Sequence, residues 1–193
     1  MRVLILHVSL HRLKDYIKAL SYKLPSDIYE GIIMLFIVGL ISALSVAGIK
    51  RGTKICFYLL LCEYYFLVLC STVIYREPSL IRKYSFLPFW SYREIADGRE
   101  ELVMEVILNI LLFVPIGILL AIVLSIKCWI KILFIAFFAS TFIELLQLLS
   151  KRGFCEFDDV IHNTFGCMIG LAIYAIIYGS IDFYNSLNIS RKK

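Results

Sequence analysis

The chain has 193 residues, of which 61% are hydrophobic and 18% are charged, with a net charge of +5. Its mean hydropathy is +0.85. A soluble domain is nearer half apolar and a quarter charged, so the composition excludes an ordinary soluble protein. The basic residues flank apolar runs, as topology signals in membrane proteins do, and this pattern argues against nucleic-acid binding.

The first predicted element is an amphipathic interfacial helix over residues 1–24. Charged residues such as Arg12 and Asp15 fall between apolar residues that recur every three or four positions. This spacing predicts a helix that lies in the headgroup plane of a membrane. A cleaved signal peptide is the alternative, but its apolar core would be short and no small-residue cleavage site follows it. The apolar positions are Leu6, Leu10, Leu13, Ile17, Leu20 and Leu24.

Five long apolar runs follow, and they predict a single transmembrane domain over residues 25–193. A helix needs about 20 apolar residues to cross a hydrocarbon core, and each run is close to that length. We therefore expect an all-α membrane protein, with a bundle of five transmembrane helices after the interfacial helix. The predicted spans are 31–49, 55–75, 102–126, 128–149 and 158–182.

The six cysteines predict neither a disulfide framework nor a zinc site. None forms a CxxC pair, and five lie within or at the edge of a predicted span. Isolated cysteines in such positions usually behave as small apolar side chains. The sequence therefore assigns no metal ligands and leaves any cofactor open.

Seven polar residues stand out because they interrupt or directly follow the last three apolar runs. Polar and ionisable groups at membrane depth are costly, and they usually face a bundle interior or a wet cavity. The seven residues are Asn109, Glu144, Gln147, Arg152, Asp158, Asp159 and Asn163.

These residues are predicted to meet beneath one membrane face. Asn109 and Asn163 lie near the starts of spans three and five, and Glu144 lies near the end of span four. At about 1.5 Å per residue, each is within roughly 10 Å of the same face. Consecutive helices joined by short loops are usually neighbours, so one layer can collect the whole set.

A structural and a functional interpretation of this layer both remain open. In the structural one, buried polar contacts join helices at roughly 0.6 kcal/mol each, and Arg152 pairs with Asp158. In the functional one, Asp158 or Asp159 caps the last span and Arg152 binds a carboxylate in a bidentate fork. His162 is expected to be packed or hydrogen-bonded rather than a ligand, and Glu63 is expected to be structural.

The order of these motifs resembles the VanZ-like family of bacterial membrane proteins. The resemblance covers about residues 70–175. One departure is the stretch 153–157, where relatives often carry a small or acidic, unbulky segment. The matching pieces are Asn109-Ile-Leu-Leu-Phe-Val-Pro115-Ile-Gly117, Glu144-Leu-Leu-Gln147, Arg152, Asp158-Asp159 and Asn163-Thr-Phe-Gly166, with Arg76-Glu77-Pro78 and Leu87-Pro88-Phe89 upstream.

The resemblance implies a role in the bacterial cell envelope. The founding member of the family confers low-level resistance to teicoplanin, a lipid-tailed glycopeptide antibiotic. It also implies a multi-pass protein of the plasma membrane whose motif face is extracellular, with the N-terminus outside and the C-terminus inside. The count of Lys and Arg leans the other way, because an inside N-terminus would place twelve of them inside and eight outside.

Two functions follow as expectations. The first is a protein that binds or shields against a lipid-tailed glycopeptide or a cell-wall lipid. The second is a membrane enzyme that modifies a lipid-linked cell-wall precursor or the antibiotic, with Glu144 and Asp159 as catalytic residues and Asp158 and Asp159 as possible metal ligands. A transporter is disfavoured because no inverted repeat is present, and a structural scaffold is the remaining alternative. The expected ligand-binding residues are Arg76, Asn109, Gln147, Arg152, Asp158 and Asn163.

Overall fold

The computed structural model describes the backbone of residues 52–190 and the side chains of residues 54–179. The predicted interfacial helix over 1–24 and the first predicted span over 31–49 lie outside the described residues. The elements are α3 (Gly52–Leu69), a π-helical turn (Cys70–Ile74), β1 (Tyr84–Ser85), α4 (Trp90–Ala96), α5 (Glu101–Leu124), a 3-10 turn (Ile126–Cys128), α6 (Trp129–Ser150), β2 (Cys155–Glu156) and α7 (Phe157–Ser190).

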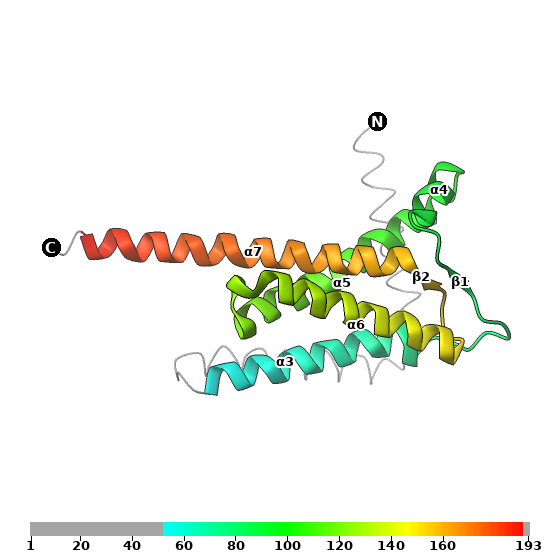
Figure 1. The fold of residues 1–193 in the computed structure, drawn as a ribbon, viewed down its shortest axis with the longest axis horizontal. Coiled ribbons are helices and arrows are strands. Elements are labelled where there is room, and N and C mark those ends of the chain that lie inside the picture. Colours follow the sequence, from blue (N-terminus) through cyan, green and yellow to red (C-terminus); the bar gives the residue numbers. More distant parts are fainter. Residues whose placement is uncertain (1–51, 191–193) are drawn as a thin grey trace.

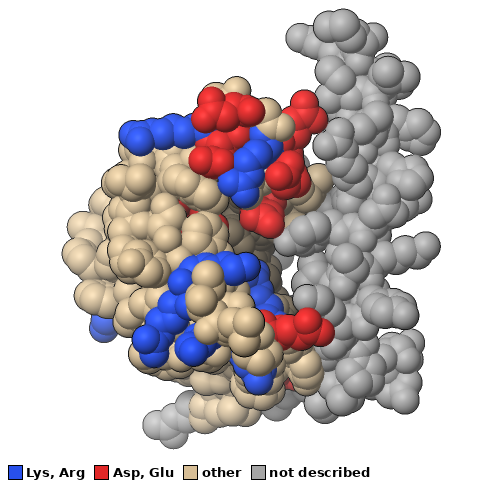
Figure 2. Space-filling model, turned by 90° about the vertical axis from the view of Figure 1, so that its right-hand side faces the viewer, with Lys and Arg blue, Asp and Glu red and all other residues tan. Residues whose placement is uncertain are grey.

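Four helical segments of the described part are long and apolar enough to cross a membrane. Their ends differ by at most three residues from the last four predicted spans. The helices α3, α6, α5 and α7 lie side by side, and α4 and the two strands gather at one end (Figure 1). Figure 2 looks onto this end, where acidic and basic side chains lie beside one another in an upper and a lower group. The segments are Lys54–Ile74, Glu101–Leu124, Ile126–Ser150 and Phe157–Gly179.

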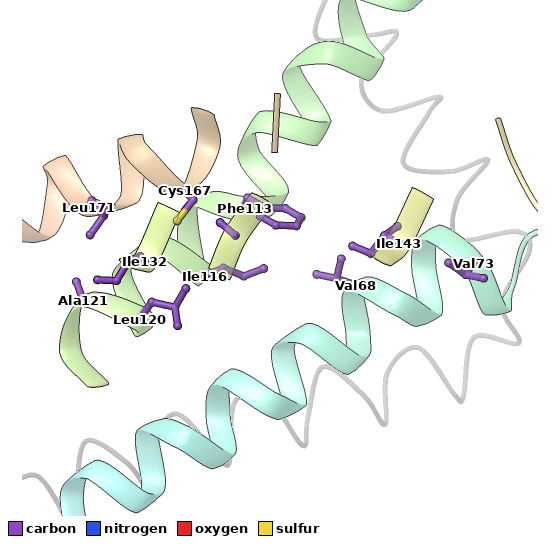
Figure 3. Packing of buried hydrophobic residues seen from close by; sticks show 11 residues of the cluster. Val68, Val73, Phe113, Ile116, Leu120, Ala121, Ile132, Ile143, Cys167 and Leu171 are labelled. Atoms are coloured by element: carbon purple, nitrogen blue, oxygen red, sulfur yellow. The ribbon is translucent and has the colours of Figure 1, made fainter. Parts of the chain in front are cut away.

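The core of the bundle is a cluster of buried apolar side chains contributed by all four long helices (Figure 3). Cys167 is fully buried within it, so this thiol packs as a small apolar group. Apolar side chains on the opposite faces, such as Phe138 and Ile176, are exposed, as expected for positions that face lipid. The cluster comprises Val68, Val73, Phe113, Ile116, Leu120, Ala121, Ile132, Ala136, Ile143, Cys167 and Leu171.

Helices α5 and α7 make the most extensive contact in the described bundle, because glycines let their backbones approach closely. A Cβ atom on Gly166 would overlap the carbonyl oxygen of Ile110, and one on Gly170 would overlap that of Val114. This spacing of two glycines four residues apart is a known means of close packing between membrane helices. The close approach sets the polar first turns of α7 directly against α5.

Two consecutive tyrosines of α3 join this helix to its neighbours. The hydroxyl of Tyr64 donates to the carbonyl of Leu112 in α5 at 3.0 Å, and that of Tyr65 donates to the carbonyl of Ala139 in α6 at 2.8 Å. These two hydrogen bonds therefore hold α3 in place by polar contacts, in a region where burial of apolar surface does not drive helix association. In α5 itself, Pro115 lies within the helix without ending it.

Two loops pair at the polar end of the bundle. Strands β1 and β2 are parallel, with Tyr84 opposite Cys155 and Ser85 opposite Glu156. The backbone N–H of Cys155 donates to the carbonyl of Lys83 at 3.1 Å. This pairing holds Glu156 over the ends of α5, α6 and α7. The sequence did not predict it, because a two-residue strand has no alternation to recognise.

Candidate functional site

Polar side chains from α5, α6, β2 and α7 meet at this end of the bundle. Asn109 Nδ2 donates to Asp159 Oδ1 at 2.6 Å, and the backbone N–H of Glu156 donates to Glu144 Oε2 at 2.8 Å. The charge of Asp159 acts on Glu105, Glu144 and Glu156, and Glu156 also interacts with both Glu105 and Glu144. We call these four acidic residues the carboxylate centre.

Three of the four residues of the carboxylate centre are largely withdrawn from solvent, whereas Glu105 is exposed. The exposed fraction is 4% for Glu144 and 7% for Glu156, and it is 21% for the side chain of Asp159. Burial, followed by the charges of Asp159 and Glu105, raises the pKa of Glu156 to about 8. At neutral pH the carboxyl group of Glu156 is therefore mostly protonated.

Arg76 is the basic residue that acts on both Glu105 and Glu144. Its guanidinium lies beside Gly153, where an added Cβ would be 2.6 Å from Arg76 Nη1 and 3.1 Å from Gln147 Oε1. Gly153 has a φ of 117°, a conformation that strongly favours glycine. The loop after α6 thus leaves a space that Arg76 and Gln147 share.

Gln147 is buried and only partly satisfied. Its Nε2 donates to the carbonyl of Thr72 at 3.4 Å, which directs Oε1 toward the space over Gly153. No described residue hydrogen-bonds this oxygen. Gln147 lies three residues after Glu144 on the same face of α6, so its unpaired oxygen borders the carboxylate centre.

Asp158 has a structural role, but it differs from the cap of the last span and from the pair with Arg152 that the sequence suggested. Its Oδ1 accepts from the backbone N–H of Phe89 at 2.6 Å, and its Oδ2 accepts from the N–H and the hydroxyl of Ser91 at 2.8 and 2.9 Å. The side chain is 1% exposed. Asp158 therefore caps the start of α4 rather than that of α7, and both of its oxygens are already used.

Arg152 does not pair with Asp158. Its guanidinium donates to the carbonyl of Ile74, and its backbone N–H donates to the carbonyl of Gln147 at 3.0 Å. Among the described ion pairs, none involves Arg152. This residue therefore joins the turn after α6 to the end of the π-helical turn that follows α3. The Arg152–Asp158 pair considered from the sequence is replaced by two separate contacts.

His162 and Asn163 extend the polar layer along α7. His162 Nε2 lies 3.0 Å from the hydroxyl of Tyr92, and His162 Nδ1 lies 3.9 Å from Asp159 Oδ1. Asn163 Nδ2 donates to Ser140 Oγ at 2.8 Å. Within the described chain, His162 Nδ1 and Asn163 Oδ1 are buried without a hydrogen-bond partner.

The predicted residues thus separate into groups. Asn109, Glu144 and Asp159 meet at the carboxylate centre, with Gln147 and Arg76 at its edge. The remaining three, Arg152, Asp158 and Asn163, have the other partners described above.

Sequence reasoning missed Glu105 and Glu156. Glu105 precedes Asn109 by four residues and so shares its helix face, a signal that could have identified it. Glu156 joins through the pairing of two loops, and it has no comparable local signal. Among the described residues, no group of three or more His, Cys, Asp or Glu side chains is arranged to hold a metal ion.

Among the comparisons with known proteins, one identifies a family for this chain. No curated protein and no solved structure matches the chain. A family model described as VanZ/LLP1 matches residues 55–178, a range that contains the whole carboxylate centre and nearly all of the four membrane-length helices. Because this match covers more than half of the sequence, the chain belongs to the VanZ/LLP1 family of membrane proteins.

Proposed function

We propose that this protein binds an amphiphile at the outer face of the bacterial plasma membrane and so shields the cell from it. The amphiphile would be a lipid-tailed glycopeptide antibiotic of the teicoplanin type or a lipid-linked cell-wall molecule. The proposal is carried by one observation: the carboxylate centre and Arg76 lie at the end of four membrane-length helices. Ionisable groups buried within or at the ends of membrane-spanning helices usually have a functional role.

The surroundings of the centre suit a ligand with both a polar and an apolar part. Large apolar side chains of the segment before α4 are exposed, including Leu80, Ile81, Phe86 and Leu87. They follow Arg76 in the chain, within the segment whose strand β1 pairs with β2. A headgroup held at the centre would thus have apolar surface beside it for a lipid tail.

We assign direct headgroup contacts to Arg76, Gln147 and the carboxylate centre. Asn109 would act through Asp159, because it already donates to that carboxylate. Asp158 and Arg152 would act through the backbone that they hold, since both side chains have backbone partners. Asn163 would support α6 and α7 through Ser140.

Antibiotic susceptibility tests this proposal. The chain would be expressed in a susceptible bacterium, and growth inhibition would be measured with teicoplanin and with a glycopeptide that lacks a lipid tail. We expect several-fold protection against teicoplanin alone. Glu144→Gln should remove the protection, whereas Glu63→Gln, which changes a glutamate in the middle of α3, should keep it. Equal susceptibility with and without the chain, at verified expression, would contradict the proposal.

An enzymatic function is the second candidate, and one arrangement favours it. Asp159 is oriented by Asn109 and faces His162, which in turn contacts Tyr92. Such a line of titratable groups can move protons in general acid–base catalysis. Here Asp159 or Glu144 would be the base that acts on a lipid-linked precursor or on the antibiotic.

Product analysis separates the two candidates. Purified protein would be incubated with lipid-linked cell-wall precursor or with teicoplanin, and the mixture would be examined by mass spectrometry. A new product that is lost in Glu144→Gln would establish an enzyme. Recovery of the unchanged molecule together with saturable binding would support the binding function.

A further inference from the structure

We propose that the carboxylate centre binds a positively charged ammonium headgroup. This inference rests on the proposed amphiphile binding and adds to it the chemical class of the headgroup. It follows from the balance of charge at the centre and from two buried polar atoms that lack partners beside it.

Acidic groups outnumber basic ones at the centre, although Glu156 is mostly protonated at neutral pH. The charge of Asp159 acts on the other three carboxyl groups, and Arg76 is the cation that acts on both Glu105 and Glu144. Arg99 also acts on Glu105, but Arg99 and Arg152 both have other partners. Arg99 pairs with Glu94 at 2.6 Å, and Arg152 donates to the carbonyl of Ile74. A ligand that brings positive charge would relieve repulsion that the protein itself leaves in place.

Two buried atoms point to a ligand independently of this charge. His162 Nδ1 is buried, has no hydrogen-bond partner in the described part of the chain, and faces Asp159 Oδ1 at 3.9 Å. When His162 Nε2–H donates to the Tyr92 hydroxyl, His162 Nδ1 and Asp159 Oδ1 are both acceptors. A single N–H group of a ligand can then donate to both of them. Gln147 Oε1 is a further unpaired acceptor, at the edge shared with Arg76.

An unsatisfied buried polar atom costs about 1–3 kcal/mol, so native structures seldom leave one without a partner. An ammonium group supplies both things that this site lacks, a positive charge and three N–H donors. An anionic headgroup would instead meet the ionised carboxylates of the centre. A metal ion is disfavoured, because no three His, Cys, Asp or Glu side chains of the described residues are arranged to ligate one.

The protonation of Glu156 fits the same conclusion. Burial and the neighbouring carboxylates raise its pKa to about 8, so the proton on Glu156 reduces the repulsion among these carboxyl groups at neutral pH. The groups that face Glu156 are Glu105 from α5, Glu144 from α6, Asp158 and Asp159 from α7, and Ser91 from α4. A bound ammonium group should therefore displace this proton.

Four probes that share one tail test the inference. Dodecylammonium, dodecyltrimethylammonium, dodecanol and dodecyl phosphate would be titrated into the full chain in neutral detergent. Binding would be followed by the fluorescence of Trp90, which lies in α4 and contacts Phe154, in a Trp129→Phe background. We expect dodecylammonium to bind at least tenfold more tightly than the alcohol or the phosphate. The trimethyl compound, which has charge but no donors, should bind with intermediate affinity.

Variants locate the binding. Glu156→Gln and Asp159→Asn should each weaken dodecylammonium binding about tenfold, whereas Glu63→Gln in α3 should not change it. The thermal midpoint of each variant would show whether it is folded. The comparison of the four probes uses the protein with its carboxylate centre unaltered, so it does not depend on any variant. Calorimetry in two buffers with different ionisation enthalpies should detect release of up to one proton at pH 7, and Glu156→Gln should abolish this release.

The outcomes separate the two proposals. If dodecyl phosphate binds more tightly than dodecylammonium, or if all four probes bind equally, the ammonium inference is overturned while amphiphile binding stands. Unchanged dodecylammonium binding in both carboxylate variants overturns it as well. If none of the tailed probes binds, the ammonium inference is overturned, and the teicoplanin susceptibility experiment decides the proposed function separately.

Discussion

Asn109 in α5 donates a hydrogen bond to Asp159 in α7, with 2.6 Å between Nδ2 and Oδ1. The bond lies beside the contact between Gly166 and Ile110, where the backbones of the two helices touch. It therefore both joins α5 to α7 and sets the direction of the Asp159 carboxylate, which on its other side faces His162.

Loss of this bond should destabilise the bundle. Asn109→Leu leaves Asp159 without its donor, and we expect a loss of about 1.5–3 kcal/mol in the free energy of unfolding, the range for hydrogen bonds to charged groups. Denaturant unfolding in detergent would measure it. Thr141→Val is the matched control, because the Thr141 hydroxyl bonds within its own helix. Additive effects of Asn109→Leu and Asp159→Asn would show that the two residues are not coupled.

Substitution of the packed glycines should separate α5 from α7. In Gly166→Leu and Gly170→Leu the new side chain overlaps backbone carbonyls of α5, so we expect each to cost about 3 kcal/mol or more. A Cβ on Gly179 meets nothing within 4 Å, and Gly179→Ala should leave stability unchanged or raise it by up to about 1 kcal/mol. Thermal midpoints that fall equally in all three variants would contradict this explanation.

Asp158→Asn should loosen α4 without disturbing the bundle. The amide retains one acceptor oxygen where the carboxylate accepts from Phe89 and twice from Ser91. We expect faster hydrogen exchange at the amides of these two residues and a cost of about 1–3 kcal/mol. Asp97→Asn, at the exposed far end of α4, serves as the control and should leave the exchange unchanged.

The stability of the protein should fall with rising pH because of Glu156. Its pKa rises from 4.5 to about 8 on folding, so between these values the folded state binds more protons than the unfolded state. The contribution is complete below about pH 4.5 and is lost as the pH rises through 8, with a slope of up to about 1.4 kcal/mol per pH unit. Glu156→Gln should flatten the curve of unfolding free energy against pH. An unaltered slope would refute the assignment.

Two glycines with positive φ allow backbone strain to be separated from an effect at the site. Gly153 and Gly98 have φ values of 117° and 103°, so alanine at either should cost about 1–3 kcal/mol. A Cβ on Gly153 would displace Arg76 and Gln147, whereas one on Gly98 meets nothing within 4 Å. We therefore expect Gly153→Ala alone to lose teicoplanin protection, measured at matched expression. Equal loss in Gly98→Ala would indicate a stability effect only.

The apolar runs alone determined the membrane-length helices within the described residues, because crossing a bilayer requires a length that is readable along the chain. The seven polar interruptions likewise indicated which end of the bundle would be polar. The depth of Asn109 and Glu144 in their spans follows from the rise of a helix, and both do lie at that end with Asp159.

The tertiary structure decided which polar groups are partners. Asp158 caps α4 and Arg152 reaches Ile74, although the sequence offered each an equally suitable charge nearby. Glu156 enters the carboxylate centre only because β1 pairs with β2. Chemically equivalent donors and acceptors compete for each such contact, and the choice depends on the path of two loops far apart in sequence. Hydrophobic length is a local property of a chain, whereas the pairing of polar groups is settled only when the loops are placed.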